Sequence, residues 1–276
     1  SDVNFEVYSD IILPQEELKF TTRYRFDKVQ ERARLKQSVS RLVTILFPEL
    51  EKLVPTLHIA SVYALLSELP SAGKIASCHL THLTKLLENA SKGRYSREKA
   101  VEIREAARVS IGSNMPAKSM ELRHTLKLIG ELDSEISEIE SEIKRIMDQI
   151  SSPILTIPGI SYRMGAMILA EIGDFSRFDS PDKILAYAGT FPIHLSIRAV
   201  GILLFPYGKA GSRYLRFALI NAAKYVCHWD EAFGAYLQKK ISEGKHYNVA
   251  ITHATKKLVR LIYTMEKSGM PYRKAA

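Results

Sequence analysis

The residues best suited to binding a ligand lie in a short turn and in the first turn of the helix that follows it, because this pattern favours phosphate binding. An apolar run ends at Pro158 and Gly159, and Ser161 is a good N-cap for the helix that follows. Backbone amides at such a helix start face outward and favour an anion, and Arg163 adds positive charge. The pattern predicts a helix-hairpin-helix that grips nucleic-acid backbone through Gly159, Ser161 and Arg163, and the alternative is a helical corner without a ligand.

Further basic residues follow this helix. We predict that Lys209, Arg213 and Arg216 also contact the phosphate backbone, although each fits an ordinary surface charge as well. Phosphate contacts position a protein without reading bases, so these residues predict no target sequence.

Metal and disulfide chemistry are poorly supported by the sequence. Cys78, His79 and His82 cluster, but a fourth ligand at a recognised spacing is missing, so we predict no metal site. Cys78 and Cys227 are too few for a disulfide framework.

The composition favours a polyanionic partner. The chain has 276 residues, 39 Lys and Arg against 30 Asp and Glu, and a net charge of +9. Nucleic acid is the first candidate for a protein this basic. No signal peptide and no apolar segment of membrane length is present, which predicts a cytoplasmic, nucleoid-associated protein without membrane contact.

Helical periodicity dominates the chain and predicts an all-α fold. Pro14–Phe47 is expected to form one long basic helix, which Pro48 ends. Residues 56–113 are expected to form short helices broken at Pro70, Gly73 and Gly93. After Pro153, helices are expected near 181–188, 211–225, 231–240 and 248–267. We therefore predict four segments: 1–55, 56–116, 117–152 and 153–276.

The segment 117–152 carries a seven-residue apolar repeat, which is typical of a coiled-coil helix. Its two seams are Leu122, Ile129, Ile136, Ile143 and Ile150, and Leu132, Ile139 and Ile146. The partner helix is either Pro14–Phe47 of the same chain or a helix of another subunit, which would make a homo-oligomer.

Several short motifs carry a family resemblance across nearly the whole chain. They are IPGI at 157–160, AEIGDF at 170–175, RF at 177–178, LAYAG at 185–189 and GSRYLR at 211–216. In order and spacing they resemble the C-terminal domain of DEDD-type insertion-sequence transposases, the family related to the pilin-gene invertase. The resemblance implies RNA-guided DNA recombination. It also implies a RuvC-like domain whose four acidic residues bind Mg²⁺, then a coiled-coil region, then a domain with a serine nucleophile.

The sequence departs from that family pattern in two places. We expect the RuvC-like domain to be absent, because no acidic quartet can be assigned, and therefore no cofactor in this chain. Family members show Pro, four variable residues and Ser-Gly. After Pro192 that count places Ile197 at the serine position, with Ser196 one residue early as a weak catalytic candidate.

A frameshift would explain the second departure. When 193–208 are back-translated with suitable synonymous codons and read one base later, the product contains the missing Ser-Gly motif. We therefore hypothesise that 193–210 are read in a shifted frame, and the alternative is an ordinary divergent segment.

These observations predict a nucleic-acid-binding C-terminal fragment of a transposase, which acts in DNA transposition but is catalytically inactive as this chain. The expected partners are DNA, a guide RNA in the intact family, and further copies of the chain. The alternative is a stand-alone, oligomeric DNA- or RNA-binding structural protein. A third interpretation is an active enzyme with Ser196 as its nucleophile.

Overall fold

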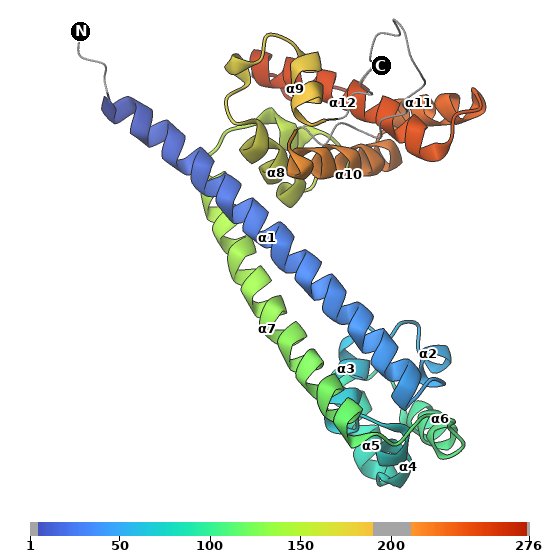
Figure 1. Ribbon diagram of the computed structural model, residues 1–276. Helices are drawn as coiled ribbons and strands as arrows, with labels where there is room; N and C mark the ends of the chain where they lie inside the picture. Colours follow the sequence, from blue (N-terminus) through green and yellow to red (C-terminus); the bar gives the residue numbers. More distant parts are fainter. Residues whose placement is uncertain (1–4, 190–210, 275–276) are drawn as a thin grey trace, which may run out of the picture. The chain divides into compact units, whose positions relative to one another are not determined.

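The computed structural model describes residues 5–189 and 211–274 (Figure 1). Within these ranges the regular elements are helices and no strand is present, so the predicted all-α fold is confirmed. The chain divides into two compact units, 1–25 with 139–276, and 26–138. Each unit is described by itself below.

Two long helices contribute residues to both units, and their ends differ from the sequence prediction. Helix α1 spans Phe5–Leu46 and helix α7 spans Pro116–Met147. The prediction that α1 begins at Pro14 is wrong, because the helix continues through this proline, whose missing N–H removes one helical hydrogen bond. The predicted end of α7 at 152 is also wrong, so Ile150 follows the helix instead of extending its repeat.

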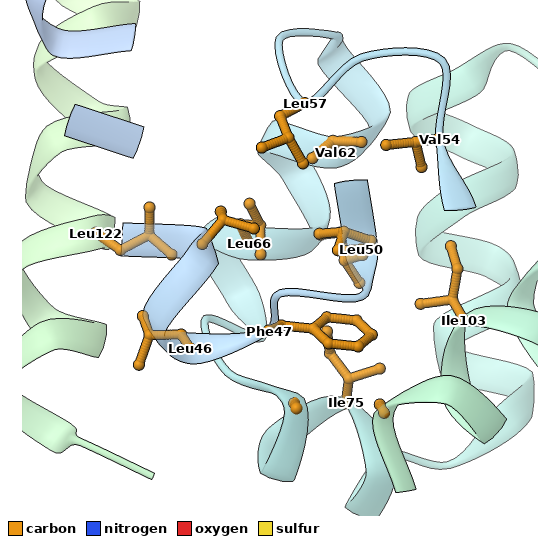
Figure 2. Close-up of a cluster of buried hydrophobic side chains, with 14 of the residues drawn as sticks. Leu46, Phe47, Leu50, Val54, Leu57, Val62, Leu66, Ile75, Ile103 and Leu122 are labelled. Atoms are coloured by element: carbon orange, nitrogen blue, oxygen red, sulfur yellow. The ribbon is translucent and has the colours of Figure 1, made fainter. Parts of the chain in front are cut away.

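The unit 26–138 combines parts of α1 and α7 with short helices. These are α2 (Leu50–Leu53), α3 (Ala60–Glu68), α4 (Ala72–Ser77), α5 (Leu80–Ser91) and α6 (Arg97–Arg108). The predicted breaks at Pro70 and Gly93 are confirmed, whereas Gly73 lies inside α4. Figure 2 shows the core of this unit, where Phe47, Ile75 and Ile103 converge from distant parts of the sequence.

Charged pairs join α1 to α7 within this unit. Lys28 Nζ lies 2.6 Å from Glu135 Oε2, and Arg32 pairs with Asp133. As the residue number rises along α1 it falls along α7, so the two helices run antiparallel. All of the predicted seam residues except Ile150 are buried within the single chain. Ion pairs within the chain therefore join α1 to α7, while a coiled coil and a pairing with another subunit stay predictions.

The unit 1–25 with 139–276 is built around α10. After α7 it contains η1 (Pro153–Thr156), α8 (Tyr162–Ile172), η2 (Phe175–Arg177), α9 (Pro181–Tyr187), α10 (Arg213–Trp229), α11 (Glu231–Ser242) and α12 (Tyr247–Ser268). Helix α10 contacts α8, α11 and α12. Its buried face includes Ala218, Ala222 and Ala223, whose small side chains allow these helices to approach closely. The four helices predicted after residue 180 are confirmed as α9 to α12, with ends that differ from the prediction by a few residues.

The structure also bears on the residues considered as metal ligands and on membrane-spanning helices. His82 Nε2 lies 2.5 Å from Glu68 Oε1, and both cysteines are free. Within the described part of the chain, no three His, Cys, Asp or Glu side chains gather in a way that could hold a metal ion. None of the helices searched there is both long and apolar enough to cross a membrane.

Candidate functional site

The turn before α8 packs directly against the end of α10. Gly159 has a φ of +89°, and a Cβ atom at this position would lie 2.6 Å from the carbonyl oxygen of Tyr225. A side chain at 159 would therefore meet both unfavourable backbone torsions and the backbone of α10. Glycine here brings the turn against the face of α10 that carries Tyr225.

The start of α8 is fixed by its cap and by its neighbours. Ser161 is the N-cap residue, and its hydroxyl accepts a hydrogen bond from Met164 N at 3.3 Å, as the sequence predicts. The Tyr162 hydroxyl oxygen lies 2.8 Å from the carbonyl oxygen of Lys144 and 2.9 Å from Asp148 Oδ1, and its one proton is shared between these two acceptors. Desolvation, together with the hydrogen bond to Asp148, raises the pKa of Tyr162 to about 12. These contacts hold the helix start in one position.

The cap of α8 gives a first testable prediction. Replacing Ser161 with alanine is expected to lower the free energy of unfolding by about 1 kcal/mol, because the Met164 amide loses its acceptor. Urea denaturation measures this change. The matched control is Ser180→Ala at the N-cap of α9, where the side chain makes no capping hydrogen bond. Equal effects of the two substitutions would contradict the role assigned to the Ser161 hydroxyl.

A groove of about 560 Å³ lies beside this helix start. Its lining consists of Arg25, Gly159, Ile160, Ser161, Arg163, Met164, Tyr225 and Trp229. Arg25 Nη2 lies 2.6 Å from Glu140 Oε1, and Arg163 Nε lies 3.3 Å from Glu140 Oε2. Two guanidinium groups thus share one carboxylate, which leaves the groove with excess positive charge.

A buried carboxylate lies at the other end of α8. The Glu171 side chain is fully buried, and Arg23 binds it with both Nε at 2.6 Å and Nη2 at 3.0 Å. The Ser212 hydroxyl donates to Glu171 Oε2 at 2.5 Å and accepts from Leu215 N at 3.1 Å. The side-chain hydrogen bond to Glu171 is the main cause that raises the pKa of Arg23. Ser212 therefore caps α10 and binds the buried carboxylate at the same time.

The residues on either side of 190–210 meet next to this carboxylate. Ser212 N donates to the Tyr187 carbonyl at 2.9 Å, and Arg216 Nη1 donates to the carbonyls of Ala188 and Gly189 at 3.3 and 3.4 Å. Gly211 has a φ of +119°, and a Cβ there would lie 2.7 Å from the Tyr187 carbonyl oxygen. These contacts join the end of α9 to the start of α10.

The predicted site residues separate into three groups in the structure. Gly159, Ser161 and Arg163 line the groove together. Arg216 binds the carbonyls at the end of α9, and the guanidinium carbon of Arg213 lies 4.6 Å from the centre of the Tyr214 ring. Neither arginine is among the residues that line the groove. Ser196, Ile197, Lys209 and the proposed frameshift at 193–210 lie outside the described residues.

Sequence reasoning missed several residues of these sites. Tyr225 and Trp229 lie one helical turn apart and are 56% and 66% exposed, a spacing visible in the sequence beforehand. Glu171 was visible as one acid within the apolar run of α8. No local sequence pattern predicts that Arg23 and Arg25 belong to these sites, because their hydrogen-bond partners lie more than a hundred residues away in the sequence.

Comparisons with known proteins find similarity to proteins of insertion elements and to a gene-inverting protein. Residues 151–238 match the family model described as "Transposase IS116/IS110/IS902 family". A pilin gene-inverting protein of Moraxella bovis is 28% identical over 158 residues, which make up 55% of this chain and 48% of that protein. The "Insertion element IS116 uncharacterized 44.8 kDa protein" of Streptomyces clavuligerus is 25% identical over 256 residues, 90% of this chain and 63% of that protein.

A further relative matches a shorter segment. The "Insertion element IS110 uncharacterized 43.6 kDa protein" of Streptomyces coelicolor is 25% identical over 136 residues, 49% of this chain and 33% of that protein. Across these three relatives the matched part covers between 33% and 63% of their lengths. The matches confirm the resemblance to insertion-sequence transposases.

Proposed function

We propose that this chain, which matches the IS116/IS110/IS902 transposase family over residues 151–238, acts in DNA transposition and binds nucleic-acid backbone beside α8. The observation that carries the proposal is the groove in which the start of α8 meets Arg25 and Arg163. The transposase family model and the name of the gene-inverting relative from Moraxella bovis support the reaction class.

The chemistry of the groove suits a phosphate group. An α-helix starts with four N–H groups that lack partners inside the helix, and the Ser161 hydroxyl takes only that of Met164. The positive end of the helix dipole and the exposed guanidinium of Arg163 act on the same space. Because Arg25 and Arg163 are opposed by the single carboxylate of Glu140, a phosphate would restore charge balance.

The proposal includes the partners and the catalytic status implied by the family resemblance. We expect DNA as the substrate, a guide RNA and a second copy of the chain as partners, and association with the nucleoid through the bound DNA. Ile197 stands at the expected position of the nucleophile, so we expect no strand transfer by this chain, with Ser196 as the weak alternative nucleophile. The Mg²⁺ that the family resemblance implies belongs to its RuvC-like domain, so we expect no cofactor on the residues of this chain.

Backbone binding is tested by its dependence on salt. Replacing Arg163 with alanine is expected to weaken duplex binding and to reduce the slope of log affinity against log salt by about 0.9, the value for one phosphate contact. Fluorescence anisotropy of a labelled duplex at several salt concentrations measures both quantities. The control is Arg145→Ala, which removes an exposed arginine that pairs with Glu142 and does not line the groove.

Two outcomes would count against the proposal. Binding that does not change with salt would remove its electrostatic basis. A slope reduced equally by Arg163→Ala and Arg145→Ala would show that general surface charge, and not the groove, contacts the backbone.

A further inference from the structure

Two large aromatic side chains are exposed on one wall of the groove. Tyr225 and Trp229 are four residues apart on α10, so they lie on the same side of the helix one turn apart. They are 56% and 66% exposed, although α10 buries its other face among α8, α11 and α12. Neighbouring exposed aromatic residues are typical of a binding surface, because each ring leaves a large apolar area in contact with water.

The rings are held in place by their neighbours. The carbonyl of Tyr225 lies against Gly159, so the backbone that carries this ring is fixed by the turn before α8. The centre of the His228 ring lies 5.1 Å from that of the Trp229 ring at an angle of 87°, an edge-to-face contact on one side of the indole. Rings that are ordered before binding lose little conformational entropy when a flat ligand stacks on them.

The remaining lining residues supply positive charge. Arg163 is 59% exposed at its side chain, and it shares Glu140 with Arg25. The groove therefore combines aromatic rings with cationic groups that are only partly neutralised. Proteins that bind single-stranded nucleic acid use this combination, with the rings stacking on bases and the cations pairing with the backbone.

We propose that the groove binds an unstacked base of a single-stranded nucleic acid. The base stacks on Trp229 and Tyr225, and the adjoining phosphate pairs with Arg163 and Arg25. The inference rests on the proposed function and adds to it the kind of strand that this site takes. A duplex keeps its bases stacked on one another, so it can reach the arginines but cannot offer a free base face to Trp229.

The chain contains one tryptophan among 13 tyrosines, so fluorescence excited selectively at the indole reports on this site alone. The whole chain is titrated at low salt with oligothymidylate, with oligouridylate and with a DNA duplex of matched length. Stacking predicts that a single strand quenches the Trp229 emission and that the duplex quenches it much less. The response to the thymidylate or to the uridylate strand distinguishes DNA from RNA as the source of the base.

Substitutions test the contribution of the rings directly. Trp229→Ala and Tyr225→Ala are each expected to lower the affinity for the single strand by about fivefold to about 150-fold, the range for the loss of one stacked base. Affinity for the duplex should change by less than about twofold, because it depends on phosphate contacts. Anisotropy of labelled oligonucleotides measures both, and circular dichroism checks that each variant is folded.

Two variants serve as controls. Trp229→Phe keeps an aromatic face and should retain most of the single-strand affinity. Tyr247→Ala removes a 46% exposed aromatic side chain on α12 that does not line the groove, and it should change neither affinity.

The outcomes separate this inference from the proposed function. Salt-dependent duplex binding without fluorescence quenching, and with full single-strand affinity in Trp229→Ala, would overturn the base site and leave the proposed function intact. An equal loss of duplex and single-strand affinity in Trp229→Ala would also overturn it. Binding to neither kind of nucleic acid would contradict the proposed function itself.

Discussion

Replacing Gly159 with alanine is expected to lower the free energy of unfolding by about 2 to 5 kcal/mol. Two physical causes combine at this position. A φ of +89° costs a residue with a Cβ about 1 to 2 kcal/mol. The new atom would also lie 2.6 Å from the Tyr225 carbonyl oxygen, and overpacking of this kind costs about 1 to 3 kcal/mol. Urea denaturation followed by Trp229 fluorescence measures the loss.

Gly244 provides a matched control in the same unit of the structure. Its φ is +81°, but a Cβ there would have no heavy atom within 4 Å. Gly244→Ala therefore carries the torsional cost alone, about 1 to 2 kcal/mol. If the two substitutions destabilise the protein equally, the close approach of the turn to α10 contributes nothing to stability.

The second large effect is expected at the buried carboxylate. Replacing Arg23 with methionine keeps an apolar stem but leaves Glu171 buried without its cation. Removal of one partner of a buried ion pair costs about 3 to 5 kcal/mol, and the 32% exposure of Arg23 places this pair near the lower value. Urea denaturation of the single and double variants at neutral pH measures the loss.

A double variant identifies the cause of that loss. Adding Glu171→Gln to Arg23→Met removes the unpaired charge and leaves an oxygen that can still accept from Ser212, so most of the stability should return. Arg32→Ala is the comparison for a more exposed pair, with an expected cost of about 1 kcal/mol or less. A double variant no more stable than Arg23→Met would show that shape, and not charge, holds Arg23 in place.

Local patterns in the sequence predicted much of the fold. The apolar repeat of α7 and the cap at Ser161 depend on residues within one or two helical turns. The structure buries the repeat residues that lie within α7 and shows the cap, while the coiled coil stays a prediction. The ends of helices α1 and α7 were not predicted from the sequence, because the terminal turns of a helix have weak local signals.

The candidate sites show the same limit more clearly. The sequence marks Gly159 as a turn residue, but it does not reveal that the backbone carbonyl of Tyr225, 66 residues later, would lie too close to a side chain there. Arg216 was predicted to bind phosphate, and this stays a prediction; the structure adds that its Nη1 donates to the carbonyls of Ala188 and Gly189. A basic side chain has the same local signal in both roles, so only its long-range surroundings distinguish a structural arginine from a ligand-binding one.

The carboxylate of Glu140 has a consequence for how tightly the groove can hold a ligand. Glu140 already occupies part of the hydrogen-bonding capacity of Arg25 and Arg163, and it is tethered to them. An incoming phosphate therefore competes with an internal counterion whose effective concentration does not fall when the solution is diluted. Competition of this kind favours fast exchange of a bound phosphate over long residence.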